Sequence, residues 1–380
     1  MQTDVTGPST QVRDLLLSVL ADARKLVEFS ATELDLTLRV ARRVKLLGRI
    51  ACQVDRAGIR ERVPQAARDQ LVSARVIAQA RERTARWELD RLAWALSGTS
   101  YEPLVVLKGG AYLLLGLPNA AGRLLTDVDL LVPEALLEHV EEHLIRMGWR
   151  SLGFTPYDQH YYRVWTHELP PMRHVEREFE VDLHHNILPR TSRLRPSPER
   201  LLEGLRPAIT DPYHCFSSET LVLHCMTHLM FDSDLSDTLR DLVDTDDLIR
   251  WYSEREPNFW EHLLERAVVL DLRRPVFYAL RYAQMYLKCP VPDAASGAVA
   301  GWGPPRIVLY LMDALVPRAM FPPHPEHVDG LMKVARFLLY LRSHWIRMPP
   351  WLLARHLAYK FYVTQIRRVP KQDAEDSAPR

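Results

Sequence analysis

The strongest fold signal in this chain is the stretch Thr126-Asp127-Val128-Asp129-Leu130, together with the turn Lys108-Gly109-Gly110 that precedes it. Before the turn, the apolar run 104–107 predicts a short buried strand, and the segment 111–117 after it predicts a helix. The stretch 126–132 predicts a second strand. Because side chains alternate between the two faces of a strand, Asp127 and Asp129 should point the same way while Val128 faces the core.

This pattern has a chemical consequence. Two carboxylates held side by side repel each other unless a cation lies between them. A hard divalent ion such as magnesium suits a site made of oxygen ligands. The glycine turn opens a helix, and the free backbone amides at a helix start attract phosphate. The pattern therefore predicts a metal-dependent enzyme that handles a nucleoside triphosphate.

The same residues resemble the nucleotidyltransferase superfamily, whose fold is that of the DNA polymerase β catalytic domain. The chain is most similar to a bacterial group of uncharacterised nucleotidyltransferases. That group has Leu-Lys-Gly, an arginine, Asp-(Ile/Val)-Asp-Leu-Leu-Val and a later acidic-x-His. The matching residues here are Leu107-Lys108-Gly109, Arg123, the run 127–132 and Asp182-Leu183-His184. The resemblance covers roughly residues 65–250, and the long spacer 111–126 fits this group better than the general superfamily.

The resemblance implies a role for each site residue. Asp127, Asp129 and Asp182 would bind magnesium, with manganese as an alternative, and Asp182 would be the base for an acceptor hydroxyl. Glu180 lies on the same predicted strand face as Asp182 and is the alternative third carboxylate. Contacts to the nucleotide would come from the turn and from residues near the carboxylates: Lys108, Gly109, Gly110, Arg123, Thr126, His184 and His228.

Each of these motifs also has a purely structural interpretation. Asp-x-Asp occurs by chance at strand ends, a glycine pair serves any tight turn, and Lys108 or Arg123 could be solvated charges. His184 and His228 could be buried, hydrogen-bonded histidines that line no cleft.

The histidines and the helix after the core leave further alternatives open. His224 and His228 share one helix face, which would allow a zinc site with nearby aspartates, but no His-Glu-x-x-His arrangement supports it. Arg240 and Asp244 are expected to tie the helical region to the core through polar pairs, with a nucleotide contact as the alternative.

The composition is that of a cytosolic globular protein. The 380 residues carry a formal net charge of +1, and 47% are hydrophobic, so no global charge favours a polyanionic partner. Four scattered cysteines without a Cys-x-x-Cys pair argue against disulfide or zinc scaffolds and suit a reducing compartment. The polar segment 1–8 is not a signal sequence, and no apolar run is long enough for a transmembrane segment. We expect a cytoplasmic location.

The expected fold is α+β, with a small mixed-sheet nucleotidyltransferase core between two helical regions. The predicted divisions are an N-terminal helical arm (1–100), the catalytic core (101–190), a C-terminal helical region (191–370) and a disordered tail (371–380). A long helix should run over 64–96, and further strands over 161–165 and 179–184. The segment 190–197 is typical of a linker. Pro322-Pro323 and Pro349-Pro350 should interrupt the last helices.

The C-terminal stretch is basic and has no intervening acid. Its cations are Lys333, Arg336, Arg342, Arg347, Arg355, Lys360, Arg367, Arg368 and Lys371, with Trp345, Trp351, Phe361 and Tyr362 among them. This pattern is typical of packed helices with a basic face. It would also suit weak contact with an anionic membrane surface or with RNA.

We therefore expect transfer of NMP from an NTP to an acceptor hydroxyl, with release of pyrophosphate. The sequence does not identify the acceptor: small molecules, protein side chains, polysaccharide precursors and RNA ends all remain candidates. One alternative is a non-catalytic module that binds a nucleotide or a partner. Another is an Asp-x-Asp nucleotide-sugar glycosyltransferase, which is disfavoured because that fold places several βα units before its Asp-x-Asp.

Overall fold

The computed structural model describes residues 8–361, apart from Gly98, Ser100, Glu102, Gly153, Phe154, Ser233 and Val328. It confirms the predicted α+β class, because helices surround one mixed sheet. The predicted tail 371–380 and the cations Arg367, Arg368 and Lys371 lie outside the described residues. Within the described part of the chain, no helix is both long and apolar enough to cross a membrane.

Seven described strands form the sheet in the order β3-β4-β5-β2-β1-β7-β6. Their bounds are β1 Leu104–Val106, β2 Asp127–Leu131, β3 Trp149–Ser151, β4 Met172–His174, β5 Glu180–His184, β6 Arg206–Pro207 and β7 Tyr213–Cys215. The central pair, β2 and β5, runs parallel, whereas β1 is antiparallel to β2. The backbone amide of Leu107 donates to the carbonyl of Asp129 and extends the β1–β2 pairing into the glycine turn.

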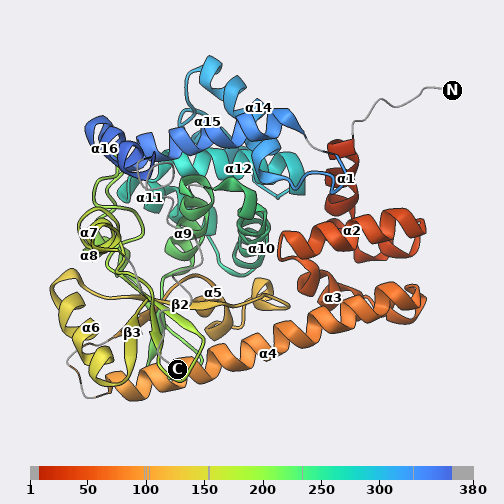
Figure 1. Ribbon diagram of the computed structural model, residues 1–380. Coiled ribbons are helices and arrows are strands. Elements are labelled where there is room, and N and C mark those ends of the chain that lie inside the picture. Colours follow the sequence, from red (N-terminus) through yellow and green to blue (C-terminus); the bar gives the residue numbers. More distant parts are fainter. Residues whose placement is uncertain are drawn as a thin grey trace.

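The N-terminal arm consists of α1 Pro8–Ala21, α2 Ala31–Arg43, α3 Leu47–Arg56 and α4 Gln65–Leu96. As predicted, α4 begins directly after Pro64, and it runs along one side of the sheet (Figure 1). The arm touches the spacer before β2 through two glycines. A Cβ built on Gly48 would lie 2.4 Å from the carbonyl oxygen of Gly122, and Gly122 has a φ of +74°. Only glycine fits this contact, so the arm helps to fix the approach to β2.

Four short helices accompany the strands: α5 Lys108–Leu114, α6 Leu137–Arg146, α7 Pro156–Trp165 and α8 Pro198–Leu201. Single 3-10 turns lie at η1 Ala23–Val27, η2 Arg60–Arg62, η3 Pro118–Ala120, η4 Glu134–Leu136 and η5 Leu235–Asp237. The helix predicted for 111–117 exists, but it begins three residues earlier, at Lys108 itself. Lys108 is therefore part of the helix start and has a left-handed φ of 45°.

The C-terminal region is helical, as predicted. Its helices are α9 Ser218–Phe231, α10 Leu239–Arg255, α11 Phe259–Val269, α12 Arg273–Leu287, α13 Asp293–Ala300, α14 Arg306–Met320, α15 Gly330–Arg347 and α16 Pro350–Phe361. The two predicted proline breaks are confirmed, because Pro322 and Pro323 follow α14 and Pro350 starts α16. Figure 1 shows α9 and α10 on the side of the sheet opposite α4, with α15 beyond them.

One predicted strand is wrong. Residues 161–165 belong to helix α7, not to a strand. Thr155 caps the helix and forms a reciprocal capping box with Asp158, and Pro156 occupies the first helical turn. The aromatic residues of this segment favour strands in general, but the capping signal that precedes them decides the local structure.

The sheet also contains strands that the sequence pattern did not predict. β3, β4, β6 and β7 have only two or three residues each, which is too short for a periodic signal. β6 and β7 lie beyond residue 190 and still join the sheet. The segment 190–197 forms no helix or strand, but Thr191 Oγ1 donates to the carbonyl of Arg347 at 2.6 Å and so holds the segment to α15. The expected division at residue 190 stays a prediction.

Candidate functional site

Asp129 and Asp182 are neighbours on adjacent strands. In the parallel β2–β5 pair, Asp129 is the Cα partner of Asp182, and Asp127 is the partner of Glu180. Paired residues of parallel strands project from the same face of a sheet. Val128 takes the opposite face and is fully buried. The structure thus brings three of the predicted carboxylates to one face, with Asp129 and Asp182 directly side by side.

The local electrostatics of Asp182 are unfavourable without a cation. Burial raises the pKa of Asp182 to about 9, and the charges of Asp129, Glu168 and Asp127 add to this effect. Its Oδ1 atom is buried and has no hydrogen-bond partner among the described residues. Buried polar atoms normally have a partner, so this oxygen is free to bind a ligand or ion.

Asp129 is instead compensated by two neighbours. Lys108 Nζ and His184 Nε2 each lie 2.8 Å from its Oδ1 atom. Burial opposes ionisation of Asp129, but the Lys108 charge and the His184 hydrogen bond outweigh it and hold its pKa well below the usual range. Burial likewise disfavours the charged form of Lys108, yet Asp129 and Glu168 raise the lysine pKa above its usual value. Lys108 therefore supplies a permanent positive charge.

Asp127 is the first residue of β2, and Thr126 directly precedes it. Thr126 Oγ1 donates to Asp127 Oδ1 at 3.2 Å. Burial raises the pKa of Asp127, and the negative charge of Asp129 raises it further. Glu180, the alternative third carboxylate, forms an ion pair with Arg173 on β4 at 2.7 Å. Of the two acids on β5, Asp182 is therefore the one with a buried oxygen that lacks a described partner.

Both glycines of the turn are buried and tightly packed. A Cβ on Gly109 would lie 2.6 Å from Leu125 Cδ2, and a Cβ on Gly110 would lie 2.7 Å from Val106 Cγ1. A Cβ at either position would force the neighbouring apolar side chain to move, so close packing by itself favours glycine at both. A contact between this turn and phosphate stays a prediction.

Arg123 lies in a buried ion pair with Asp244 of α10. Its guanidinium carbon also lies 5.2 Å from the ring centroid of Tyr112. Burial disfavours the charged form of Arg123, but Asp244 raises its pKa above the usual value. This pair connects the segment before β2 to the helical region. The lining of the cavity described below does not include Arg123, and a contact between Arg123 and the nucleotide stays a prediction.

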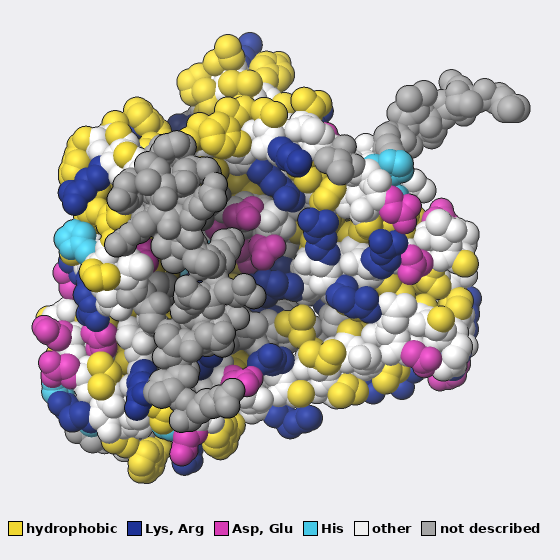
Figure 2. Space-filling view, viewed as in Figure 1, with side chains coloured by type: hydrophobic (Ala, Val, Ile, Leu, Met, Phe, Trp, Pro, Cys, Tyr) yellow, Lys and Arg dark blue, Asp and Glu magenta, His cyan; other side chains and the backbone are white. Residues whose placement is uncertain are grey.

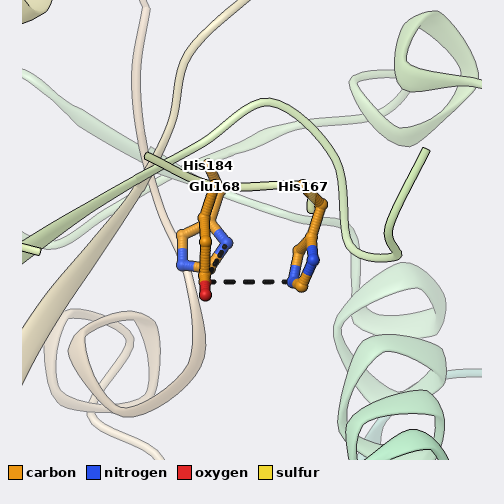
Figure 3. A group of neighbouring side chains, drawn as sticks. All are labelled: His167, Glu168 and His184. Carbon is orange, nitrogen blue, oxygen red and sulfur yellow. Dashed lines mark ion pairs between the residues drawn. The ribbon is translucent and has the colours of Figure 1, made fainter. Parts of the chain in front are cut away.

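Glu168 is a site residue that sequence reasoning missed. Its Oε2 atom lies 3.4 Å from His184 Nδ1 and 4.0 Å from His167 Nε2, and the dashed lines in Figure 3 join the carboxylate to both rings. Residues 167–169 run beside β5, since the His185 amide donates to the carbonyl of His167 at 2.8 Å. Glu168 lies between α7 and β4, where no periodic pattern marks it. Only the tertiary pairing with β5 identifies it.

The described residues contain two groups whose ligand atoms all lie within 4.8 Å of one another. One consists of Asp129, Asp182 and His184, and the other of His167, Glu168 and His184. Burial holds the pKa of His167 well below its usual range, so its ring is neutral and able to bind a metal. Neither group includes His224 or His228, and the zinc site considered from the sequence therefore gains no support from the described side chains.

The helix α9 contributes His228 to the site. His228 Nδ1 lies 2.8 Å from Asp241 Oδ2 on α10. Burial disfavours the imidazolium, but Asp241 outweighs this effect and raises the pKa of His228. The same pairing lowers the pKa of Asp241 to about 2, although burial acts in the opposite direction. One turn earlier, His224 is buried and forms no ion pair with a described acidic residue, and burial holds its pKa well below the usual range.

A cavity of about 230 Å³ lies next to the carboxylates. Its lining combines sheet-side residues with helices from the C-terminal region: Lys108, His167, Glu168, Asp182, Ile187, Leu188, His228, Phe231, Asp232 and Arg347. Three buried atoms in this lining have no described partner, namely Asp182 Oδ1, His167 Nδ1 and Arg347 Nε. Three larger hollows, of about 510, 550 and 340 Å³, contain none of the predicted site residues. The smaller cavity is therefore the better candidate site.

The mixed sheet, with its facing carboxylates beside a lysine-glycine turn, is consistent with a nucleotidyltransferase fold. The chain belongs to the family of uncharacterised nucleotidyltransferases, whose family model matches residues 30–288. This match confirms the resemblance inferred from the sequence and supports a transferase of nucleotidyl groups. No curated protein and no solved structure matches the chain. The matched range ends before α14, α15 and α16.

Proposed function

We propose that this protein transfers NMP from an NTP to an acceptor hydroxyl in a metal-dependent reaction that releases pyrophosphate. The observation that carries the proposal is the alignment of Asp129 with Asp182, whose buried Oδ1 has no described partner. The family match supports nucleotidyl transfer and an NTP substrate. The facing carboxylates and the adjoining cavity support the metal and the position of the reaction.

The donor set fits a hard divalent cation. Asp127, Asp129 and Asp182 would hold magnesium, or manganese, because carboxylate oxygens are the preferred ligands of both ions. Their mutual repulsion and the unpartnered Asp182 oxygen are the features that a cation would relieve. When bound, such an ion stabilises negative charge on the attacking and leaving oxygens of an in-line displacement.

The residues of the chain would divide the remaining tasks. Asp182 would accept the proton of the acceptor hydroxyl through its free oxygen. His184 holds Asp129 in place through Nε2, while its Nδ1 atom faces Glu168. This arrangement fixes the ring and, through it, the orientation of the Asp129 carboxylate.

The cavity also offers positive charge for a polyphosphate. Lys108 approaches it from the start of α5, and Arg347 approaches it from the end of α15. Arg347 has a buried Nε without a described partner, and a guanidinium can bind phosphate through two parallel hydrogen bonds. We infer that these two cations, with His228, hold the phosphates of the NTP. Arg347 is a residue that sequence reasoning assigned only to the basic C-terminal stretch.

The direct test is transfer of label from each α-labelled NTP, in the presence of magnesium, to fractionated cell extract. Pyrophosphate release in the same mixture provides an independent measurement. We expect both signals with the wild-type protein and neither with Asp129→Asn/Asp182→Asn. A matched control is Asp237→Asn, because Asp237 is exposed and, among the described residues, forms an ion pair only with Lys45 at the surface.

The outcome also separates the competing functions. NTP binding without any label transfer or pyrophosphate release would overturn catalysis and favour a nucleotide-binding module on the same fold. Transfer of a sugar from a nucleotide-sugar donor, without use of an NTP, would favour the glycosyltransferase alternative. Label transfer that survives in the double variant would remove Asp129 and Asp182 from the catalytic site.

A further inference from the structure

The solvent-facing sides of α14 and α15 are apolar, which is the reverse of the usual pattern for surface helices. On α15, Val334, Phe337 and Leu338 are 52%, 60% and 43% exposed, and Trp345 continues the same stripe. Their spacing of three, four and seven residues keeps them on one helix face. The opposite face, which includes the buried Ala335 and Leu339, packs into the protein core.

The neighbouring helix has the same character. On α14, Ile307 and Tyr310 are 72% and 74% exposed, and Leu311 is 56% exposed. The two helices pack against each other, and Figure 2 shows hydrophobic side chains gathered over this part of the molecule. Exposed apolar surface that is contiguous in this way marks an interaction site more often than chance exposure. We call these outer faces of α14 and α15 the apolar face.

Charge identifies the partner of the apolar face. Arg306, Arg318 and Lys333 are exposed cations on the same two helices. The sequence has no acidic residue from Gly330 to Phe361. The one acid within α14, Asp313, is already paired with Arg281 through two hydrogen bonds of 2.9 and 2.7 Å. The surface therefore offers apolar and positively charged groups but little free negative charge.

We propose that the apolar face docks on an anionic lipid membrane, with its side chains in the boundary between headgroups and acyl chains. Amphipathic helices bind membranes through apolar side chains on one face and cations that contact anionic headgroups. Tyr310 and Trp345 are of the aromatic types that favour this boundary. A second copy of the chain fits less well, because a two-fold contact would bring the cations of both copies together.

The site carboxylates and the apolar face lie on different elements, so the two proposals are tested separately. The probe is flotation of the full-length protein with vesicles of phosphatidylcholine alone, or of phosphatidylcholine mixed with phosphatidylglycerol. We expect binding to the anionic vesicles at low salt and a steep loss as salt rises, because exposed charges are screened within about 8–10 Å at physiological ionic strength.

Two variants separate the apolar and the charged contributions. Phe337→Glu should weaken vesicle binding roughly ten- to hundred-fold, the range expected for loss of one buried aromatic side chain. Lys333→Gln should weaken it about five-fold, the effect of one cation near an anionic surface. The matched control is Ile209→Glu, since Ile209 is 79% exposed and lies between β6 and β7, away from the apolar face. Circular dichroism and melting temperature show whether each variant is folded.

A second design avoids charge insertion into the protein. Tyr310→Ser shortens an exposed side chain of α14 and should weaken vesicle binding without affecting the fold. The proposal is overturned if the wild-type protein does not float with anionic vesicles at low salt, or if Phe337→Glu and Ile209→Glu bind equally. Salt-sensitive binding of RNA, but not of vesicles, that Phe337→Glu abolishes would assign the face to RNA and also overturn it. Dimerisation that Phe337→Glu abolishes, without vesicle binding, would assign the face to a second copy instead.

Discussion

Asp129 on β2 and Asp182 on β5 are Cα partners in one parallel pair, yet their carboxyl pKa values move in opposite directions. Lys108 and His184 both contact Asp129 at 2.8 Å, whereas the Oδ1 atom of Asp182 has no described partner. The charge of Asp129 is therefore compensated by its neighbours, whereas that of Asp182 is not. Because of this difference, we expect a bound cation to contact Asp182.

The first prediction concerns the metal. Magnesium with an NTP should stabilise the wild-type protein, by about 2.7 kcal/mol at a free ligand concentration one hundred times Kd. Asp129→Asn/Asp182→Asn should remove this stabilisation, because it deletes two of the proposed ligand carboxylates. Thermal unfolding with and without magnesium and NTP measures the effect, and Asp237→Asn should respond like the wild type. A full shift in the double variant would show that the metal binds elsewhere.

The second prediction concerns pH dependence in the absence of metal. An aspartate in an unfolded chain has a pKa of about 3.9, whereas folded Asp182 has a pKa of about 9. Between these values the folded protein holds a proton that the unfolded chain has released, so stability falls as pH rises. Asp182→Asn cannot ionise and should remove part of this slope. We expect a gain of about 1–3 kcal/mol at pH 8 relative to wild type, and little gain near pH 4.

Denaturant unfolding at both pH values, in the presence of a chelator, measures this gain. Asp127 also has a raised pKa, so a smaller slope should persist in the Asp182→Asn variant. Identical slopes in the variant and the wild type would contradict the raised pKa of Asp182.

The third prediction concerns Arg347. If its guanidinium binds the NTP phosphates, Arg347→Gln should raise KM for the NTP roughly ten- to hundred-fold, because a charge-assisted hydrogen bond contributes about 1.5–3 kcal/mol. Arg347→Lys should restore only part of the affinity, since lysine cannot bind phosphate through a planar fork. The matched control is Lys333→Gln, on the same helix but exposed and outside the cavity lining. Unchanged KM in Arg347→Gln would exclude the phosphate contact.

The fourth prediction separates structural and nucleotide roles for Arg123. Its buried pair with Asp244 means that Arg123→Met leaves an uncompensated buried carboxylate. We expect a loss of about 3–5 kcal/mol in the free energy of unfolding. Arg123→Met/Asp244→Leu should recover much of that loss, because it removes both charges. A large rise in KM for the NTP with unchanged stability would instead make Arg123 a nucleotide-binding residue.

The α+β class, the family and the shared face of Asp127 and Asp129 could all be predicted from the sequence. These features are local, since a strand period of two and a glycine turn are visible within a few neighbouring residues. Local signals also gave the proline breaks and the start of α4. The strand predicted over 161–165 is wrong for a local reason as well, because the capping box at Thr155 starts helix α7 there.

The remaining residues of the candidate site can be identified only from the tertiary structure. Arg123 meets Asp244 across 121 positions of sequence, and Arg347 reaches the cavity from a helix outside the matched family range. Glu168 lies beside His184 because residues 167–169 run along β5. Such contacts depend on how whole elements pack, and no local period encodes them. The apolar face of α14 and α15 could not be predicted from the sequence either. Periodicity shows that a helix has an apolar side, but only the packing shows which side is buried.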